Sequence, residues 1–186
     1  MPAIDAIPAR AVPSVKPRIA VVIFALLAAC MPNVSQKSQP PAGQFRDQSR
    51  PLYSTAGLRV ARLLGNWQQV AGYGPAPACA RLPAITFQAV QDGVHVAYDL
   101  CFANERASGA GALTSDGAQG RYRLPNFLSP IWVLWIDQDN RTMAIGSPDN
   151  RIAMILAKSP PPADHIRAAR EILAWNGYDL AKFYQY

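Results

Sequence analysis

The sequence has 186 residues, enough for one ordinary domain with additional chain, and this length excludes a multidomain machine. Half of the residues are apolar and 16% are charged, a balance that excludes a fully disordered chain. Lys and Arg outnumber Asp and Glu by 18 to 12, but no block of like charge forms the basic stripe typical of a nucleic-acid reader.

The first element of the chain is an apolar run at residues 19–29, IAVVIFALLAA, which follows Arg10, Lys16 and Arg18. It is shorter than the ~20 residues that a membrane-spanning helix needs. A basic start, a short apolar stretch and small residues at its end together predict a secretory signal. The run ends in Leu27-Ala28-Ala29-Cys30, which resembles the lipobox of bacterial lipoproteins, where cleavage precedes a cysteine that becomes lipidated. The alternative is a plain signal peptide with a chance cysteine.

The lipobox resemblance implies a location and a domain plan. A multiply acylated Cys30 would hold the protein on a membrane, because two lipid signals anchor stably where one chain is marginal. Met31 is not Asp, which in lipoproteins favours the outer membrane, here with the protein facing the periplasm. We therefore expect a leader at 1–29, a flexible Pro-, Gln- and Ser-rich tether at 30–55, and a folded domain at 56–186.

Two cysteines remain once Cys30 is assigned to lipidation. Cys79 and Cys101 are an even pair, and in an oxidising compartment an even pair predicts a disulfide. The bridge would contribute on the order of 3 kcal/mol in the chain-entropy model. Two unrelated buried thiols are the alternative.

Short strand signals dominate the folded region after one or two helical turns within 55–64. An Asp92-Gly93 pair between apolar runs predicts a hairpin. The clearest alternation follows it and puts Val94, Val96, Tyr98 and Leu100 on one face. Predicted strands cover residues 66–73, 84–90, 94–102, 107–114, 119–124, 131–136, 141–146 and 151–157. An amphipathic helix after Pro160, a stop at Gly177 and a short tail strand complete the chain. This order predicts an all-β fold: an eight-stranded antiparallel up-and-down barrel with one C-terminal helix packed outside.

Several motifs along this barrel resemble those of bacterial outer-membrane lipocalins. The first strand opens with the G-x-W triplet Gly65-Asn66-Trp67, directly after the helical turn. The second half carries WVLWID from Trp132, AIG from Ala144, Pro148, ILAKSP from Ile155 and NGYDLAKF from Asn176, in that order. The resemblance covers roughly residues 56–186.

The resemblance implies that Trp67, with Gly65 beside it, plugs the closed end of the barrel. The family usually has an arginine over this tryptophan, and the matching position here is Lys158. Lysine also places a cation over an indole but lacks the planar stacking of guanidinium. An aromatic residue common at the position of Met154 is absent. Because closure brings the first and last strands together, we expect Lys158 near the Trp67 ring.

The predicted function is binding, transport or storage of a small hydrophobic ligand, a fatty acid such as palmitate or a lysophospholipid. An eight-stranded barrel is wide enough inside for one such molecule. The candidate lining residues are Val94, Val96, Tyr98 and Leu100, with Gln69 and Trp135 as weaker candidates, and with Tyr73 and Phe102 near a ligand headgroup. The alternative is an envelope lipoprotein with a filled barrel that binds another protein through its rim.

No catalytic or metal set is expected. His95 falls on the polar face of its strand, and His165 falls in the first turn of the helix, so both are predicted to be solvated. Asp137 and Asp139 share one turn, where Asp commonly makes local hydrogen bonds. Two histidines and three cysteines exclude a four-cysteine zinc site, and their spacing does not fit a mixed cysteine–histidine zinc site. We expect no enzyme activity, no cofactor and no nucleic-acid partner, only a ligand and a membrane.

Overall fold

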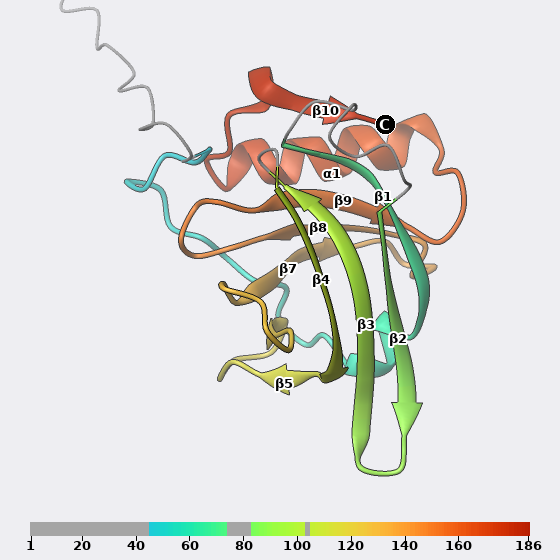
Figure 1. The fold of residues 1–186 in the computed structure, drawn as a ribbon. Coiled ribbons are helices and arrows are strands. Elements are labelled where there is room, and N and C mark those ends of the chain that lie inside the picture. Colours follow the sequence, from blue (N-terminus) through green and yellow to red (C-terminus); the bar gives the residue numbers. More distant parts are fainter. Residues whose placement is uncertain (1–44, 74–82, 103–104) are drawn as a thin grey trace, which may run out of the picture. The chain divides into compact units, whose positions relative to one another are not determined.

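The computed structural model describes residues 45–73, 83–102 and 105–186 (Figure 1). The predicted leader, the lipidation site Cys30 and the predicted disulfide partner Cys79 lie outside the described residues. Among the helices of the described ranges, none has the length and apolar character needed to cross a membrane.

The strands of the described residues form one antiparallel sheet that curls into a nearly closed barrel (Figure 1). They are β1 (Gly65–Tyr73), β2 (Ala84–Val90), β3 (Gly93–Phe102), β4 (Glu105–Ala112), β5 (Thr114–Ser115), β6 (Arg121–Arg123), β7 (Ile131–Ile136), β8 (Thr142–Gly146), β9 (Ala153–Ala157) and β10 (Phe183–Gln185). The order is β4-β3-β2-β1-β9-β8-β7-β6-β5, and β10 pairs with β1. The last barrel strand thus lies beside the first, as an up-and-down barrel requires.

The strand count differs from the predicted eight for a local reason. The predicted strand at 107–114 is interrupted at Leu113, so that β4 pairs with β3 and β5 pairs with β6. The Leu113 N–H donates instead to the Val94 carbonyl at 2.8 Å. The tenth strand is the predicted tail strand, which adds to the edge of β1.

One α-helix, α1 (Ala163–Trp175), packs on the outside of the barrel as predicted (Figure 1). Its buried residues Ile166, Ala169 and Leu173 recur at helical spacing and face the sheet. Gly177 ends it with φ +91°, a conformation in which glycine carries no Cβ penalty. Within the described ranges, short 3-10 helices precede two strands: η1 (Val60–Leu63) lies before β1, and η3 (Leu180–Lys182) lies before β10.

Apolar side chains form two separate clusters, one on each face of the curled sheet. The interior cluster fills the barrel and includes Trp67, Phe87, Val96, Tyr98, Leu100, Met143, Met154 and Leu156. The outer cluster lies under α1 and includes Ala71, Tyr73, Leu134, Ile155, Leu173, Tyr178 and Phe183. Strands β8 and β9 are buried along their whole length because they face both clusters.

Two β-bulges decide which side chains reach which cluster. The β1–β9 register shifts between Gln69 and Ala71, and the β7–β8 register shifts between Val133 and Trp135. A bulge inserts one residue and so moves every later side chain of its strand to the opposite face. Ala71 and Tyr73 therefore join the outer cluster, whereas simple alternation from Trp67 would point them into the barrel.

Part of the predicted tether belongs to the folded domain, which corrects the boundary placed at residue 55. Phe45 stacks on Tyr73 with ring centroids 3.9 Å apart. Arg46 is buried, and it donates to the Asn176 carbonyl and to Asn150 Oδ1, each at 2.7 Å. A short bridge between Arg46 and Tyr178 fixes this segment beside the end of α1.

Candidate functional site: the barrel interior and its open end

Four of the predicted lining residues lie together on the inner face of β3. Val96, Tyr98 and Leu100 belong to the interior cluster, and Val94 packs against it while remaining partly exposed. No bulge interrupts the pairing of β3 with β2, so the alternation read from the sequence carries through the whole strand. These side chains form the wall of the candidate site.

Tyr98 is the polar member of this wall. Its hydroxyl donates to the Pro125 carbonyl at 2.7 Å, and burial raises the pKa of the phenol. A Cβ added at Gly109 would come within 2.7 Å of the Tyr98 hydroxyl, so the glycine of the neighbouring strand makes room for the ring. The glycine at position 109 is thus explained by the size of its cross-strand neighbour Tyr98.

The segment that follows β6 packs against β3 and β4 and reaches Phe102, the last residue of β3, at the end of the barrel that we call the mouth. Phe127 lies edge-on to Tyr98 and to Phe102, each at a centroid distance of 5.4 Å. Pro125 lies where a Cβ on Gly111 would approach it to 3.1 Å. Phe102 was predicted to lie near a ligand headgroup, and the structure places its partly exposed ring against Phe127.

Side chains fill the described barrel interior. Trp67, Val96 and Met154 expose none of their surface, and Leu100 exposes 1%. A cavity wide enough for an acyl chain would leave accessible surface on the side chains that line it. The partly exposed members include Val94, Phe102 and Phe127, so the accessible part of the site lies toward the last two at the mouth.

Gln69 reaches the barrel interior, but its side-chain amide is hydrogen-bonded to the backbone of Cys101. Its side-chain amide donates to the Cys101 carbonyl at 2.7 Å, and its oxygen accepts from the Cys101 N–H at 3.0 Å. Its backbone N–H donates to Pro83, just before β2 begins. Gln69 therefore holds the end of β3 where β2 no longer covers it, and its amide is already engaged within the protein.

Tyr73 and Trp135 lie outside the barrel, contrary to their prediction as candidate lining. Both follow a bulge in their strand and join the cluster under α1. The Tyr73 hydroxyl donates to the Asp179 carbonyl at 2.6 Å, and burial raises its pKa strongly. Neither residue can contact a ligand inside the barrel.

The closed end brings together the residues predicted to plug it. Trp67 is fully buried, and its indole N–H donates to the Leu63 carbonyl of η1 at 2.6 Å. Lys158 Nζ lies 4.6 Å from the centroid of the indole ring. A Cβ on Gly65 would meet the Lys158 side chain at 3.4 Å, so this glycine, with φ +113°, leaves space for the lysine. Burial lowers the pKa of Lys158, and the charge of Asp137 partly opposes that effect.

Asp137, Thr142 and His165 form a polar cluster beside the plug. His165 Nδ1 lies 3.2 Å from Thr142 Oγ1 and 3.3 Å from Asp137 Oδ2. A catalytic relay needs the acid and the nucleophile on different ring nitrogens, whereas here one nitrogen faces both. Asp137 Oδ1 also accepts the backbone N–H groups of Arg141 and Thr142, which is the local turn bonding predicted for it. The cluster ties the first turn of α1 to the β7–β8 turn.

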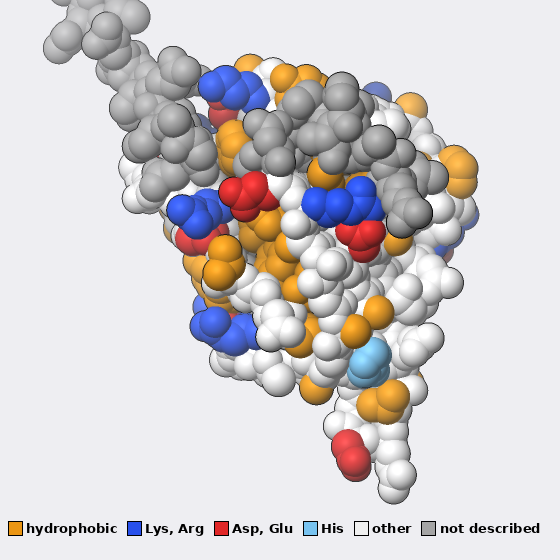
Figure 2. All heavy atoms as spheres, viewed as in Figure 1, with side chains coloured by type: hydrophobic (Ala, Val, Ile, Leu, Met, Phe, Trp, Pro, Cys, Tyr) orange, Lys and Arg blue, Asp and Glu red, His pale blue; other side chains and the backbone are white. Residues whose placement is uncertain are grey.

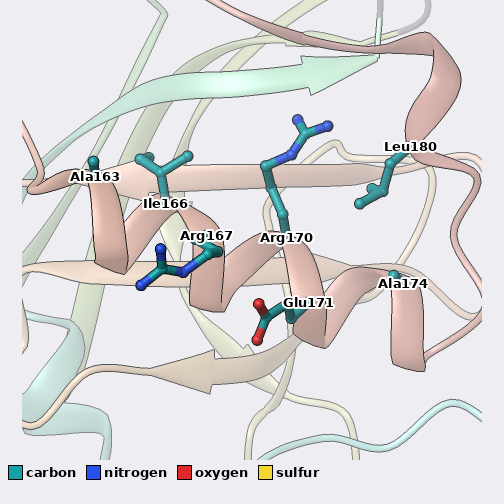
Figure 3. Close-up of a pocket in the computed structure, with 7 residues that line it drawn as sticks. All are labelled: Ala163, Ile166, Arg167, Arg170, Glu171, Ala174 and Leu180. Atoms are coloured by element: carbon teal, nitrogen blue, oxygen red, sulfur yellow. The ribbon is translucent and has the colours of Figure 1, made fainter.

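An open groove of about 420 Å³ runs along α1 on the outside of the barrel (Figure 3). Its walls come from α1 and η3: Ala163, Ile166, Arg167, Arg170, Glu171, Ala174 and Leu180. No predicted lining residue contributes to this groove. On the face seen in Figure 2, basic and acidic side chains are interspersed.

No local pattern in the sequence indicates the structural roles of two residues, Phe127 and Arg46. Phe127 lies in a predicted loop, and its role depends on contacts with β3 that are 25 or more positions away. Arg46 lies in a stretch whose composition favours a tether, yet it reaches Asn150 and Asn176 through the fold.

Known proteins share this architecture. The structure is similar to insecticyanin from the tobacco hornworm Manduca sexta, with a TM-score of 0.52 and 15% identity over 73% of this chain and 83% of that one. Weaker likenesses are to the cockroach allergen Per a 4 (TM-score 0.49, 13% identity, 69% and 87% covered) and to the siderocalin Ex-FABP (0.47, 14%, 66% and 91%). No curated protein matches the sequence significantly.

The sequence itself matches the model of the lipocalin-like domain over residues 58–186, from η1 through the barrel and α1 to the last residue. With this match and the barrel-plus-helix architecture, the chain belongs to the lipocalin-like domain family.

Proposed function

We propose that this protein is a membrane-anchored lipocalin that binds a small hydrophobic ligand, a fatty acid or lysophospholipid, on the periplasmic side of the outer membrane. The single observation that carries ligand binding is the aromatic group Tyr98, Phe102 and Phe127 at the mouth of an apolar barrel. Each buried methylene of an acyl chain would contribute about 0.8 kcal/mol before ordering costs.

The ligand site opens when Phe127 leaves its place. Phe127 is partly exposed, and it contacts the wall through the edges of the Tyr98 and Phe102 rings. Its segment hydrogen-bonds to the wall through Tyr98 and Pro125. Displacing one aromatic side chain would expose the inner face of β3 without breaking the sheet. An acyl chain would then pack on Tyr98 and Leu100, with its headgroup at the rim.

A second candidate is the filled barrel acting as a protein-interaction module. The low exposure of the interior side chains favours it, because a filled interior has no volume for an acyl chain. In that case Phe127 is permanent packing and the rim is the functional surface.

Two measurements separate the candidates. Native mass spectrometry of the full chain purified from membranes reports a co-purified lipid, and titration with a fluorescent fatty acid reports affinity. Phe127→Ala removes the side chain that occupies the mouth, so we expect tighter fatty-acid binding, by about tenfold or more. Leu128→Ala is the matched control, because Leu128 is 85% exposed in the same segment. No lipid and no binding in either variant would establish the second candidate instead.

The anchor is proposed at Cys30, supported by the lipobox pattern in the sequence. Cys30→Ser should release the protein from the membrane fraction. Unchanged fractionation of this variant would remove the lipoprotein proposal.

A Cys79–Cys101 disulfide is proposed for the same oxidising compartment. Cys101 is buried, with its backbone held by Gln69 on the adjacent barrel wall. The bridge would tie the connection between β1 and β2 to the end of β3, and its loss should cost about 2–5 kcal/mol. Alkylation of both thiols in the native, unreduced protein would contradict it.

A further inference from the structure

An exposed aromatic pair lies where the folded domain begins. Trp175, the last residue of α1, exposes 63% of its surface, and Tyr53 exposes 52%. Their ring centroids are 5.4 Å apart. Together they present two neighbouring aromatic rings to solvent, and contiguous exposed apolar groups mark interaction surfaces.

The backbone around the pair is fixed, so its exposure is built into the fold. The Tyr53 N–H donates to Asn176 Oδ1 at 3.0 Å, and the Asn176 amide donates to the Ile172 carbonyl at 2.9 Å. The Arg50 guanidinium reaches the Ala174 carbonyl at 3.4 Å and its side chain is 54% exposed. The Arg50 guanidinium thus lies beside the last turn of α1, and its Nε is also 4.0 Å from Asp47 Oδ2.

The chain enters the domain beside this pair. Phe45, the first described residue, hydrogen-bonds through its carbonyl to Asp179, and the Asp47 N–H donates to Gly177, two residues after Trp175. Fourteen residues separate Cys30 from Phe45, and a chain of that length spans at most about 50 Å. A lipid at Cys30 would therefore hold the start of the folded domain within about 50 Å of the bilayer, a range in which the Tyr53–Trp175 surface can reach it.

We infer that Tyr53 and Trp175, with Arg50, form a membrane-docking surface that inserts into the interfacial region of a phospholipid bilayer. Tyr and Trp favour this region because their rings are apolar and their polar ends remain hydrated, and Arg pairs with lipid phosphates. The inference rests on the proposed anchor, which supplies proximity. Docking would orient the domain so that the chain-entry side of α1 faces the lipid.

Tryptophan quenching tests this surface. The full-length lipidated protein is placed on phosphatidylethanolamine–phosphatidylglycerol vesicles whose acyl chains carry bromine near the headgroup. We expect brominated lipid to reduce the emission of the unmodified protein, and Trp175→Phe to remove at least half of that reduction. Tyr184→Phe, an exposed aromatic on β10, is the matched control and should retain the full reduction. Equal quenching with and without Trp175, or no quenching of vesicle-bound protein, would overturn the inference.

Co-sedimentation with vesicles distinguishes failure of the Cys30 anchor proposal from failure of the docking-surface inference. If the unmodified protein does not sediment with vesicles, the Cys30 proposal fails, and Cys30→Ser protein is then added to the same brominated vesicles at high lipid. Quenching that depends on Trp175 under those conditions supports the docking surface, and its absence overturns it. If sedimentation velocity shows a dimer that Trp175→Ala dissociates, the surface binds a second copy of this chain and the membrane inference is wrong.

Discussion

Lys158, directly after β9, holds its Nζ 4.6 Å from the centroid of the Trp67 ring on β1, where the last barrel strand meets the first. The ammonium lies over the indole ring, and the Leu63 carbonyl accepts the indole N–H. These contacts join the β1–β9 pairing to η1, because the indole comes from β1, the carbonyl from η1 and the ammonium from the residue after β9.

Replacing Trp67 should damage the fold far more than replacing its cationic neighbour. Trp67→Ala removes a fully buried ring, and we expect a loss of about 3–5 kcal/mol in the free energy of unfolding. Lys158→Ala should cost about 0.5–1 kcal/mol because that side chain is largely exposed. Urea denaturation measures both, with Lys158→Arg as a control expected to be neutral or stabilising. A loss above about 2 kcal/mol for Lys158→Ala would contradict this ranking.

Gly109 should tolerate no side chain. The new Cβ of Gly109→Ala would lie 2.7 Å from the Tyr98 hydroxyl and 2.9 Å from the ring, so the ring must move. Overpacking of this kind costs about 1–3 kcal/mol. Ala110→Ser, on the exposed face of the same strand, is the matched control and should be near neutral. Thermal unfolding of both variants checks the expectation, and equal midpoints would show that Tyr98 is not confined by β4.

Arg46 should contribute more to the stability of the fold than its position before the predicted domain boundary suggests. Its guanidinium is buried and donates to Asn176, Asn150 and the Arg50 carbonyl. Arg46→Ala should lower the free energy of unfolding by about 2–3 kcal/mol, because hydrogen bonds to a charged group are lost. Arg50→Ala, an exposed arginine four residues later, should cost less than about 1 kcal/mol. If Arg46→Ala costs as little as Arg50→Ala, the 45–50 segment contributes little to stability.

Alkaline pH should destabilise the protein through two buried tyrosines. Burial raises the pKa of Tyr178 and of Tyr73 well above the ordinary value of about 10. Above that value the unfolded chain loses these protons while the folded chain retains them, so stability falls as pH rises. Each tyrosine adds a slope of up to about 1.4 kcal/mol per pH unit in that range.

The test compares urea unfolding between pH 9 and pH 11. Tyr178→Phe should reduce the decline in stability across this range, whatever its cost at neutral pH. Trp175→Phe removes no phenol and should keep the decline of the unmodified protein. An unchanged decline in Tyr178→Phe would show that other groups govern alkaline unfolding.

Local patterns in the sequence were enough to predict the helix and most strands, and the family resemblance added the tryptophan plug at the closed end. The alternation of β3 runs unbroken from Val94 to Leu100, so its inward face could be read directly. Trp67 and Lys158 could be paired because barrel closure joins the first strand to the last. These features depend on residue spacing within one element or on the order of elements.

Only the tertiary structure decided which way Tyr73 and Trp135 face and what fills the mouth. Side chains alternate between the two faces of a strand, so one inserted residue moves every later side chain to the opposite face. Nothing in the sequences of β1 and β7 marks Val70 or Leu134 as the inserted residue. Phe127 occupies the mouth because Gly109 and Gly111 let Tyr98 and Pro125 approach the strand closely. Such packing depends on the sizes of side chains from distant segments, and the sequence of any one segment does not contain it.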